Sequence, residues 1–334
     1  MSNPTPLVSV VIPTFSRPQF LSRAINSALK GMDKKDIEVI VVPNGPDRSW
    51  QDTLTVFNNH PQIRIAPIEK AHANAARNHG LKLANGKYIR FLDDDDYLIV
   101  SGAIKQYQLL EDSQAECCSG LLLSADINGS VLGQISFPET DDFVCACLSV
   151  SGFTLPVGNV FLRSALHQTL WDEKIDRQQD NAWMMRLAGL KEWNWIHYNE
   201  PVGVWFQHSG HRTSTVRTAT DNPRPIVQIV FDLYELLDRK NRLTAARRLA
   251  IANALWHYAH RFFPFSPAYW HHIAKEAKRI SSASKPSHPM FSYPYLNHFD
   301  PLMLEWAMLP LRRTSHFLRK VRGLVFGFDY RRKL

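Results

Sequence analysis

The fold is decided by three stretches of sequence: LVSVVIP at residues 7–13, IEVIVVP at residues 37–43 and YIRFLDDDD at residues 88–96. Short, continuous apolar runs of this kind are typical of strands that are buried on both faces of a parallel sheet. The first two runs end at a proline and the third ends at a row of aspartates. Polar loops are therefore expected directly after the carboxyl ends of these strands.

Segments with helical spacing of apolar residues separate the predicted strands. The predicted helices are Phe20–Leu29, Gln51–Asn58 and Ala71–Ala84, and Ile63–Pro67 is a further short strand. This alternation indicates an α/β class with a mostly parallel central sheet and right-handed crossovers.

Ligands of such sheets bind beyond the carboxyl ends of the strands. We therefore expect the loops Pro13–Pro18, Pro43–Asp47 and Asp93–Asp96 to lie together along one edge.

The composition is that of a globular protein. The chain has 334 residues, of which 45% are hydrophobic and 21% charged, and this excludes a disordered or fibrous chain. From Pro223 onward the pattern becomes helical, with apolar residues of 226–237 on one stripe. We predict a catalytic domain at residues 1–218 and a helical C-terminal region at residues 219–334.

The net charge of +8 is concentrated at the C-terminus. Arg312–Leu334 holds eight Lys or Arg and one Asp, so the remainder of the chain is nearly neutral. One helical face of this tail is apolar and consists of Phe317, Leu318, Val321, Leu324, Val325 and Phe328. A basic amphipathic segment is typical of a helix that lies on an anionic membrane surface. The alternative is a helix packed on the catalytic domain; a nucleic-acid partner is not expected, because the body lacks a basic face.

Three further features bear on the cellular compartment. The four cysteines lack zinc-site spacing and are interpreted as reduced thiols, which suits a cytoplasmic protein. Residues 1–6 carry no basic targeting segment. The uncharged stretch Phe143–Leu162 contains too many polar residues for a membrane span, and we predict a buried strand and loop there.

Asp93–Asp96 is the strongest chemical signal in the sequence. Four adjacent carboxylates repel one another unless a cation or solvent relieves them, and hard oxygen ligands are what Mg²⁺ or Mn²⁺ prefers. The run alone is also compatible with a solvated turn, a helix N-cap, a two-metal nuclease or a phosphatase.

Three blocks in order resemble the N-terminal half of family 2 glycosyltransferases: VSVVIPTFSRPQFLSRAINSAL, EVIVVPNGPD and ARNHGLKLANGKYIRFLDDDDYL. Residues 163–189 resemble that family's acceptor block. The resemblance covers about residues 7–215 and implies a GT-A fold, an α/β domain that binds a nucleotide sugar. It implies no role for the last third of the chain.

Several donor-binding residues are implied by the resemblance. Pro13 and Thr14 correspond to the place where the family's first strand meets the nucleotide. Asn44 stands where an acidic residue usually contacts the base, so this chain departs from the family, although an amide carbonyl still accepts a base N–H. Arg77 corresponds to an arginine that approaches the diphosphate or braces the acidic loop; its alternative is a helix-surface salt bridge.

The family pattern Asp-x-Asp-Asp matches Asp93, Asp95 and Asp96. It implies Asp95 as the metal ligand, with Asp93 or Asp94 contacting the ribose or bracing the loop. The family's loop after Val202–Phe206 implies His208 as a further metal ligand and Arg212 as a phosphate contact.

Asp180 aligns with the second residue of the family's acidic pair, and Gln179 replaces the first. The resemblance implies that Asp180 is the base of an inverting transfer, which takes the proton of the acceptor hydroxyl. The alternative is that Asp180 caps a helix beginning at Asn181. Trp171 and Trp183 are candidates either for stacking on a sugar or for core packing.

The resemblance thus implies a metal-dependent inverting glycosyltransferase that uses Mn²⁺ or Mg²⁺ and a nucleoside-diphosphate sugar. A UDP-sugar is the first candidate for this donor. The expected acceptor is a glycan or glycolipid of bacterial cell-surface polysaccharide or lipopolysaccharide synthesis, on the inner face of the cytoplasmic membrane. One alternative is a nucleotidyltransferase acting on a sugar phosphate, but such an enzyme needs a Gly-rich loop where this chain has PTFSRP. The other alternative is a non-catalytic membrane-docked binding module.

Overall fold

A computed structural model describes residues 5–33, 35–149, 152–167, 169–208 and 223–326, with side chains described as far as residue 318. The chain forms two compact units, Met1–Gly210 and His211–Leu334. Because residues 209–222 lie outside the described part, the domain boundary at 218/219 stays a prediction.

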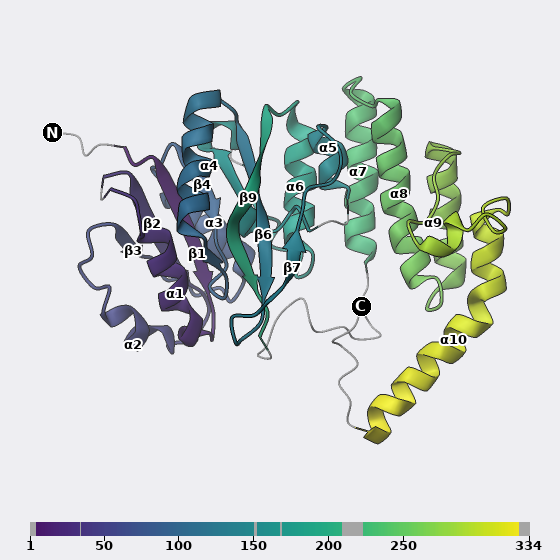
Figure 1. Cartoon of the computed structure of the whole chain (residues 1–334), viewed down its shortest axis with the longest axis horizontal. Helices are drawn as coiled ribbons and strands as arrows, with labels where there is room; N and C mark the ends of the chain where they lie inside the picture. Colours follow the sequence, from purple (N-terminus) through teal and green to yellow (C-terminus); the bar gives the residue numbers. More distant parts are fainter. Residues whose placement is uncertain (1–4, 34, 150–151, 168, 209–222, 327–334) are drawn as a thin grey trace. The chain divides into compact units, whose positions relative to one another are not determined.

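The first half of the N-terminal unit is a parallel sheet, as the sequence predicts. It consists of β1 (Val8–Thr14), β2 (Ile37–Pro43), β3 (Ile63–Ile65) and β4 (Tyr88–Phe91), in the order β3-β2-β1-β4. The connecting helices are α1 (Pro18–Leu29), α2 (Trp50–Thr55) and α3 (Ala73–Leu83). Figure 1 shows these elements in purple and blue.

The second half of the sheet is mixed. It continues from β4 through β8 (Asn159–Leu162), β6 (Cys117–Ala125), β9 (Trp195–Phe206) and β5 (Tyr97–Leu98), and β7 (Val131–Ile135) pairs with β6. Figure 1 labels β6, β7 and β9 of this half. Only β6 and β9 pair in parallel here; β8, β7 and β5 each pair antiparallel to their neighbours. The helical elements of this half are α4 (Val100–Ser113), α5 (Phe143–Cys147), η1 (Pro156–Gly158), η2 (Arg163–Leu166) and α6 (Gln179–Leu190).

Packing fixes β1 and β4 at the centre of the unit. Every residue of β1 is buried, and α3 approaches it so closely that a Cβ atom on Gly80 would lie 2.3 Å from Cγ1 of Val11. Arg90 of β4 is fully buried; it donates to the carbonyl of Val157 (3.1 Å) and to Gln106 of α4. This buried polar contact ties the end of the parallel half to the mixed half.

The stretch Phe143–Leu162 folds into α5, η1 and the buried strand β8, so the prediction of a buried strand is confirmed and a short helix precedes it. Across the described residues, no helix is long and apolar enough to cross a membrane. The four cysteines carry free thiols.

The C-terminal unit is helical. It consists of α7 (Arg224–Arg239), α8 (Ala245–Phe262), α9 (Pro267–Ile280), η3 (Pro289–Ser292) and α10 (Pro301–Phe326). The predicted apolar stripe of α7 is buried at Ile226, Ile229, Val230, Leu233 and Leu237. This unit therefore has its own apolar core.

Candidate active site

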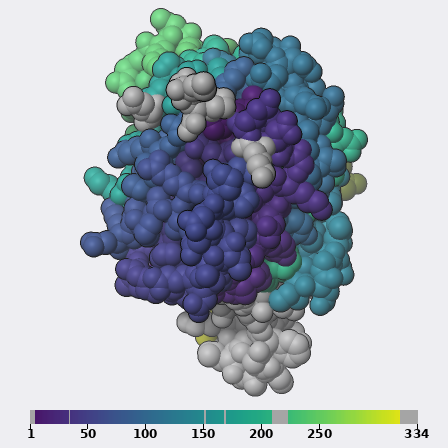
Figure 2. All heavy atoms as spheres, turned by 90° about the vertical axis from the view of Figure 1, so that its left-hand side faces the viewer, coloured from purple at the N-terminus to yellow at the C-terminus, as the bar shows by residue number. Residues whose placement is uncertain are grey.

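The three loops that follow β1, β2 and β4 meet at one edge of the sheet, as the sequence predicts. The backbone N–H of Asn44 donates to the carbonyl of Thr14 (3.0 Å), and the backbone N–H of Ser16 donates to Oδ2 of Asp47 (3.1 Å). Nη2 of Arg17 lies 2.6 Å from Oδ1 of Asp94. Figure 2 looks onto the side of the molecule that these N-terminal elements form, coloured purple to blue.

Most of the acidic loop is buried, so the alternative of a solvated turn does not describe it. Asp94, Asp95 and Asp96 expose 0%, 6% and 3% of their surface, whereas the side chain of Asp93 is 30% exposed. Buried carboxylates need compensating partners, because the cost of removing a charge from water is large. The loop has several such partners, most of them cations.

Two arginines of the α1 region hold the loop. Arg17 pairs with the carboxylates of both Asp94 and Asp95. Arg23 donates from Nη2 to the backbone carbonyl of Asp95 (2.7 Å), and its guanidinium lies 3.8 Å from the ring centre of Phe206. On the other side of the loop, Oδ1 of Asp96 accepts from the backbone N–H of Phe206 (2.9 Å). The end of β9 is thereby fastened to the acidic loop.

The loop also offers a set of oxygens that suits a divalent cation. One carboxylate oxygen from each of Asp93, Asp95 and Asp96 lies within 4.8 Å of the others. His208 follows β9, and its Nε2 lies 3.1 Å from Oδ2 of Asp95. Hard oxygens with one imidazole nitrogen fit Mg²⁺ or Mn²⁺. The chemistry of this donor set therefore agrees with the metal site that the sequence predicts.

Asp94 lies deeper than its neighbours. Burial is the main cause that raises the pKa of its carboxyl to about 7, and the cation of Arg17 and the neighbouring side chain of Thr14 oppose this shift. Because the side chain is fully buried, its position suits bracing of the loop, which is one of the two roles considered for it.

The predicted nucleotide-binding residues lie at the ends of β1 and β2. Pro13, Thr14 and Asn44 are buried. Nδ2 of Asn44 donates to the carbonyl of Thr14 (2.9 Å). This hydrogen bond orients the amide, so Oδ1 is the atom that would accept the predicted hydrogen bond from a base N–H. Gly45 follows with φ +81°, where a Cβ atom would lie 2.6 Å from Cβ of Ala71. The tight turn thus requires glycine.

Arg77 of α3 joins the acidic loop to the start of α6. Its Nη2 lies 2.6 Å from Oδ1 of Asp93, and its Nη1 donates to Oε1 of Gln179 (2.9 Å) and to Oδ1 of Asn74 (3.0 Å). The guanidinium also stacks over Trp171, 4.5 Å from the ring centre. Arg77 is only 6% exposed, so the alternative of a plain helix-surface salt bridge does not describe it.

Two asparagines of α3, which the sequence analysis missed, position the segment before α6. Nδ2 of Asn74 donates to the carbonyl of Asp172 (2.6 Å). Asn78 donates to the carbonyl of Trp171 (2.9 Å) and accepts from its backbone N–H (2.8 Å). Their spacing of four residues on a predicted helix is the signal that could have found them, because such residues share one face.

Asp180 lies in the first turn of α6, which begins at Gln179 and not at Asn181 as predicted. Burial raises the pKa of its carboxyl, whereas the backbone N–H of Asn181 and the cation of Arg77 oppose the shift; Asp93 adds to it. Asp180 thus shares one electrostatic environment with Arg77 and Asp93. The N-cap of α6 is Gln178, so Asp180 does not cap the helix as the alternative expected. The structural alternative to a base is that the Asp180 carboxylate stabilises the first turn, where the helix dipole favours a negative charge.

Trp171 and Trp183 pack on each other in the core. Their rings are stacked with centres 4.5 Å apart, Phe91 contacts both edge-on, and each residue is 2% exposed. Of the two roles considered for them, core packing is the one observed. A sugar has no access to these rings.

Arg17 and Arg23 contact the acidic loop but were not predicted as site residues, and Asp96 was matched to the family pattern without a role. Arg17 stands in the PTFSRP turn after β1, and a cation beside that strand end is the signal that could have found it. Arg212 lies outside the described residues, so its predicted phosphate contact stays a prediction.

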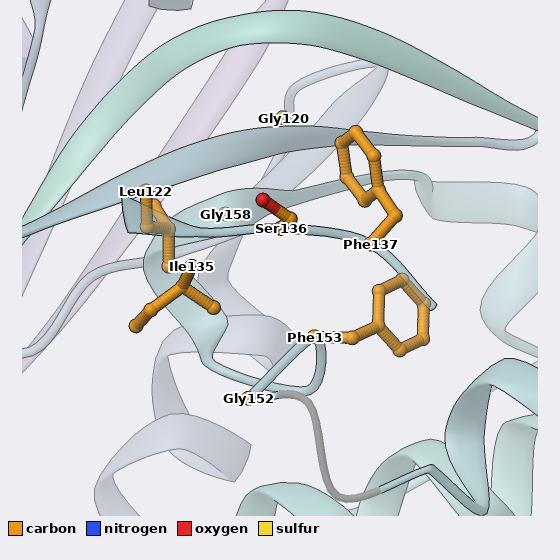
Figure 3. A pocket seen from close by; sticks show the side chains of 8 residues that line it. All are labelled: Gly120, Leu122, Ile135, Ser136, Phe137, Gly152, Phe153 and Gly158. Atoms are coloured by element: carbon orange, nitrogen blue, oxygen red, sulfur yellow. The ribbon is translucent and has the colours of Figure 1, made fainter. Parts of the chain in front are cut away.

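A separate apolar pocket lies beside β6 and β7. Its walls include Leu122, Ile135, Phe137 and Phe153, and Figure 3 shows the two phenylalanine rings on one side with the Ser136 hydroxyl between the walls. None of the predicted site residues lines it. The pocket is therefore separate from the acidic loop and contributes no charged group to the candidate site.

We expect Arg77→Met to destabilise the N-terminal unit, because Asp93 and Gln179 would lose a buried partner. Breaking a buried ion pair costs about 3–5 kcal/mol, and the partial exposure of Asp93 favours the lower end, about 3 kcal/mol. Urea unfolding followed by circular dichroism measures this. Arg186→Met is the matched control, since Arg186 pairs with Asp172 at 2.6 Å but is 41% exposed; about 1 kcal/mol or less is expected there. Equal losses for the two variants would contradict this account of Arg77.

The sequence comparisons with known proteins point to one family. Residues 9–133 match the model of Glycosyl transferase family 2. The chain is 30% identical over 191 residues to the GalNAc(5)-diNAcBac-PP-undecaprenol beta-1,3-glucosyltransferase of Campylobacter jejuni, covering 54% of this chain and 59% of that protein. It is 29% identical over 168 residues to the Poly(ribitol-phosphate) beta-glucosyltransferase of Bacillus spizizenii, covering 48% of this chain and 26% of that protein. The chain thus spans less than two thirds of the length of either relative.

Among solved structures, S. aureus TarS 1-349 in complex with UDP-GlcNAc is similar over 97% of this chain and 93% of that one, with a TM-score of 0.67. The sequences are 15% identical, so this likeness concerns the fold. It agrees with the mixed sheet and the helical C-terminal region described above.

Proposed function

Because the N-terminal unit of this chain belongs to glycosyl transferase family 2 and has the GT-A fold, we propose that the chain transfers a sugar from a nucleoside-diphosphate sugar to a glycan or glycolipid acceptor, with inversion at the anomeric carbon. The single observation that carries the proposal is the meeting of the acidic loop with Arg77 and the start of α6. Donor-binding and acceptor-activating groups then face the same edge of the sheet.

On the donor side, Asp95 and His208 would hold Mn²⁺ or Mg²⁺, with Asp93 and Asp96 offering further oxygens. A divalent cation there supplies positive charge that stabilises the departing nucleoside diphosphate. Arg17 and Arg77 keep the carboxylates in place through their ion pairs. Arg212 is proposed to contact a phosphate.

The proposed donor is a UDP-sugar. Pro13, Thr14 and Asn44 form the base-binding end, where Oδ1 of Asn44 accepts from a base N–H because its NH₂ already donates to Thr14. Asp93 is the partly exposed carboxylate of the loop and is proposed to contact the ribose, while Asp94 braces the loop from inside. The UDP-GlcNAc bound by TarS supports this choice of nucleotide.

On the acceptor side, Asp180 is proposed as the general base. Inverting transfer needs a carboxylate that removes the proton of the acceptor hydroxyl as the oxygen attacks the anomeric carbon. Burial holds the pKa of Asp180 above its usual value, which makes the carboxylate a stronger base. The carboxylate lies in the first turn of α6.

The proposed acceptor is a cell-surface glycan or a lipid-linked glycan at the inner face of the cytoplasmic membrane. The names of two relatives support this class, since one acts on an undecaprenol-linked substrate and the other on poly(ribitol-phosphate). Membrane docking by the tail Arg312–Leu334 belongs to the same proposal; residues 327–334 lie outside the described part.

A donor screen tests the proposal. The chain is incubated with several nucleotide sugars and acceptor extract, with Mn²⁺, Mg²⁺ or EDTA, and the released nucleotide is identified. We expect UDP from one UDP-sugar, and none in EDTA. Release of pyrophosphate would favour a nucleotidyltransferase, and donor binding without release would favour a non-catalytic module; either result would overturn the proposal.

A further inference from the structure

Helix α10 of the C-terminal unit exposes an apolar face. Met303, Trp306, Leu311, Phe317 and Leu318 expose 61%, 44%, 62%, 66% and 59% of their surface; we call these five residues the outer face. At 100° per residue they fall within an arc of about 140°, and the 15 steps from Met303 to Leu318 extend about 22 Å along the helix. The outer face is thus one continuous stripe.

The opposite side of α10 is anchored inside the unit. Leu302, Glu305 and Leu309 are buried, and Glu305 pairs with both Arg312 and His260 of α8. Nη2 of Arg312 also donates to the carbonyl of His260 (2.5 Å). Because turning the helix inward would leave a buried carboxylate without its partners, the orientation of α10 about its own axis is fixed. The outer face is therefore a lasting surface of this unit.

The sequence of this part of the chain is strongly basic. Residues 260–334 hold 13 Lys or Arg and four Asp or Glu, a net charge of +9, while the whole chain carries +8. Within the described side chains of this segment the three acidic residues are all paired: Glu276 with Arg279, Asp300 with Lys278 and Glu305 with Arg312. The remaining field thus favours an anionic partner.

We propose that the outer face of α10 docks on an anionic lipid bilayer, with the helix lying in the headgroup region. Apolar side chains enter the acyl boundary, and the basic sequence of this part of the chain attracts anionic headgroups. A second copy of the chain is a poorer occupant, because it would bring two regions of +9 together. This proposal deepens the tail docking proposed above, with which it shares Phe317 and Leu318, and it adds Met303, Trp306 and Leu311 of the helix before the basic tail.

Vesicle binding by the full-length chain tests this without donor or acceptor, so its outcome is independent of the proposed transferase activity. Sedimentation with vesicles of phosphatidylcholine plus phosphatidylglycerol gives the partition coefficient. For the triple variant Met303→Gln, Leu311→Gln, Phe317→Gln we expect a loss of roughly tenfold or more. Vesicles of phosphatidylcholine alone should bind the wild type weakly.

The matched control is the triple variant Ile127→Gln, Val131→Gln, Leu132→Gln. These residues lie at the β6–β7 hairpin of the other unit with similar exposures of 63%, 61% and 60%, and binding should be unchanged. Thermal unfolding checks that both triple variants are folded; should the α10 triple unfold early, Leu311→Gln alone should still weaken binding several-fold. Equal partition of both triple variants, no binding by the wild type, or an oligomer that only the α10 variant dissociates would overturn the proposal.

Discussion

Asp95→Asn is expected to abolish metal-dependent transfer and to leave the chain folded. Oδ2 of Asp95 lies beside His208, and its carboxylate belongs to the oxygen cluster with Asp93 and Asp96. The amide keeps the shape of the side chain but removes the negative charge that attracts a divalent cation. Loss of charge stabilisation of this kind costs at least 10²–10³-fold in turnover. Turnover with the UDP-sugar and binding of UDP with and without Mn²⁺ are the measurements.

Asp52→Asn is the control for this variant, because Asp52 is an exposed residue of α2 in the same unit. It should bind UDP and Mn²⁺ like the wild type. The assignment of Asp95 fails should a folded Asp95→Asn variant keep the Mn²⁺-dependent increase in UDP affinity together with normal turnover.

Asp180→Asn is expected to lower turnover by roughly 10²–10⁴-fold, the usual contribution of a general base. The asparagine retains the size of the side chain and an acceptor oxygen, but it cannot take a proton. UDP-sugar binding should be unchanged, because the acidic loop keeps its partners. Turnover at saturating donor, with donor affinity measured separately, distinguishes the base from a residue that only stabilises the first turn of α6. Loss of both stability and donor binding would favour the stabilising role.

The pH profile adds a second readout for Asp180. The base acts only when ionised, so activity falls as the pH drops through its pKa. Because burial raises that pKa above the usual value of an aspartate, this acid limb should lie at a higher pH than for an exposed carboxylate. Asp176→Asn should keep the limb, since the Asp176 side chain is 86% exposed; in Asp180→Asn the limb should be absent from the residual activity.

The parallel half of the sheet could be predicted from the sequence because each strand is a continuous apolar run with a clear end. The meeting of the three loops at one edge followed from that topology. The ion pair between Arg17 and Asp94 shows that the loops after β1 and β4 are in contact. The mixed half could not be predicted in the same way. Its strand β8 pairs with β4 and β6. These pairings join residues that are far apart in sequence, and no local sequence pattern encodes them.

The partners of the acidic loop were also beyond sequence reasoning. Arg23 reaches the carbonyl of Asp95 from 72 residues away, and Asp96 accepts from the backbone of Phe206, 110 residues away. Phe317 and Leu318 of the exposed stripe of α10 were found from the sequence, but its part from Met303 to Leu311 was missed, because an apolar face on a helix usually marks the side that is buried. The exposure of Met303 and Leu311, and the ion pairs of Glu305 with His260 and Arg312 on the opposite side, show which side faces outward.

The central claim is that the edge of the sheet beyond β4 holds a metal ion and a nucleoside diphosphate. Anomalous diffraction from crystals of the chain grown with UDP and Mn²⁺ tests it most directly. The account predicts a manganese peak within bonding distance of an Asp95 oxygen, with the diphosphate of UDP beside it. Manganese bound elsewhere on the chain, or UDP bound away from Asn44 and the acidic loop, would contradict it.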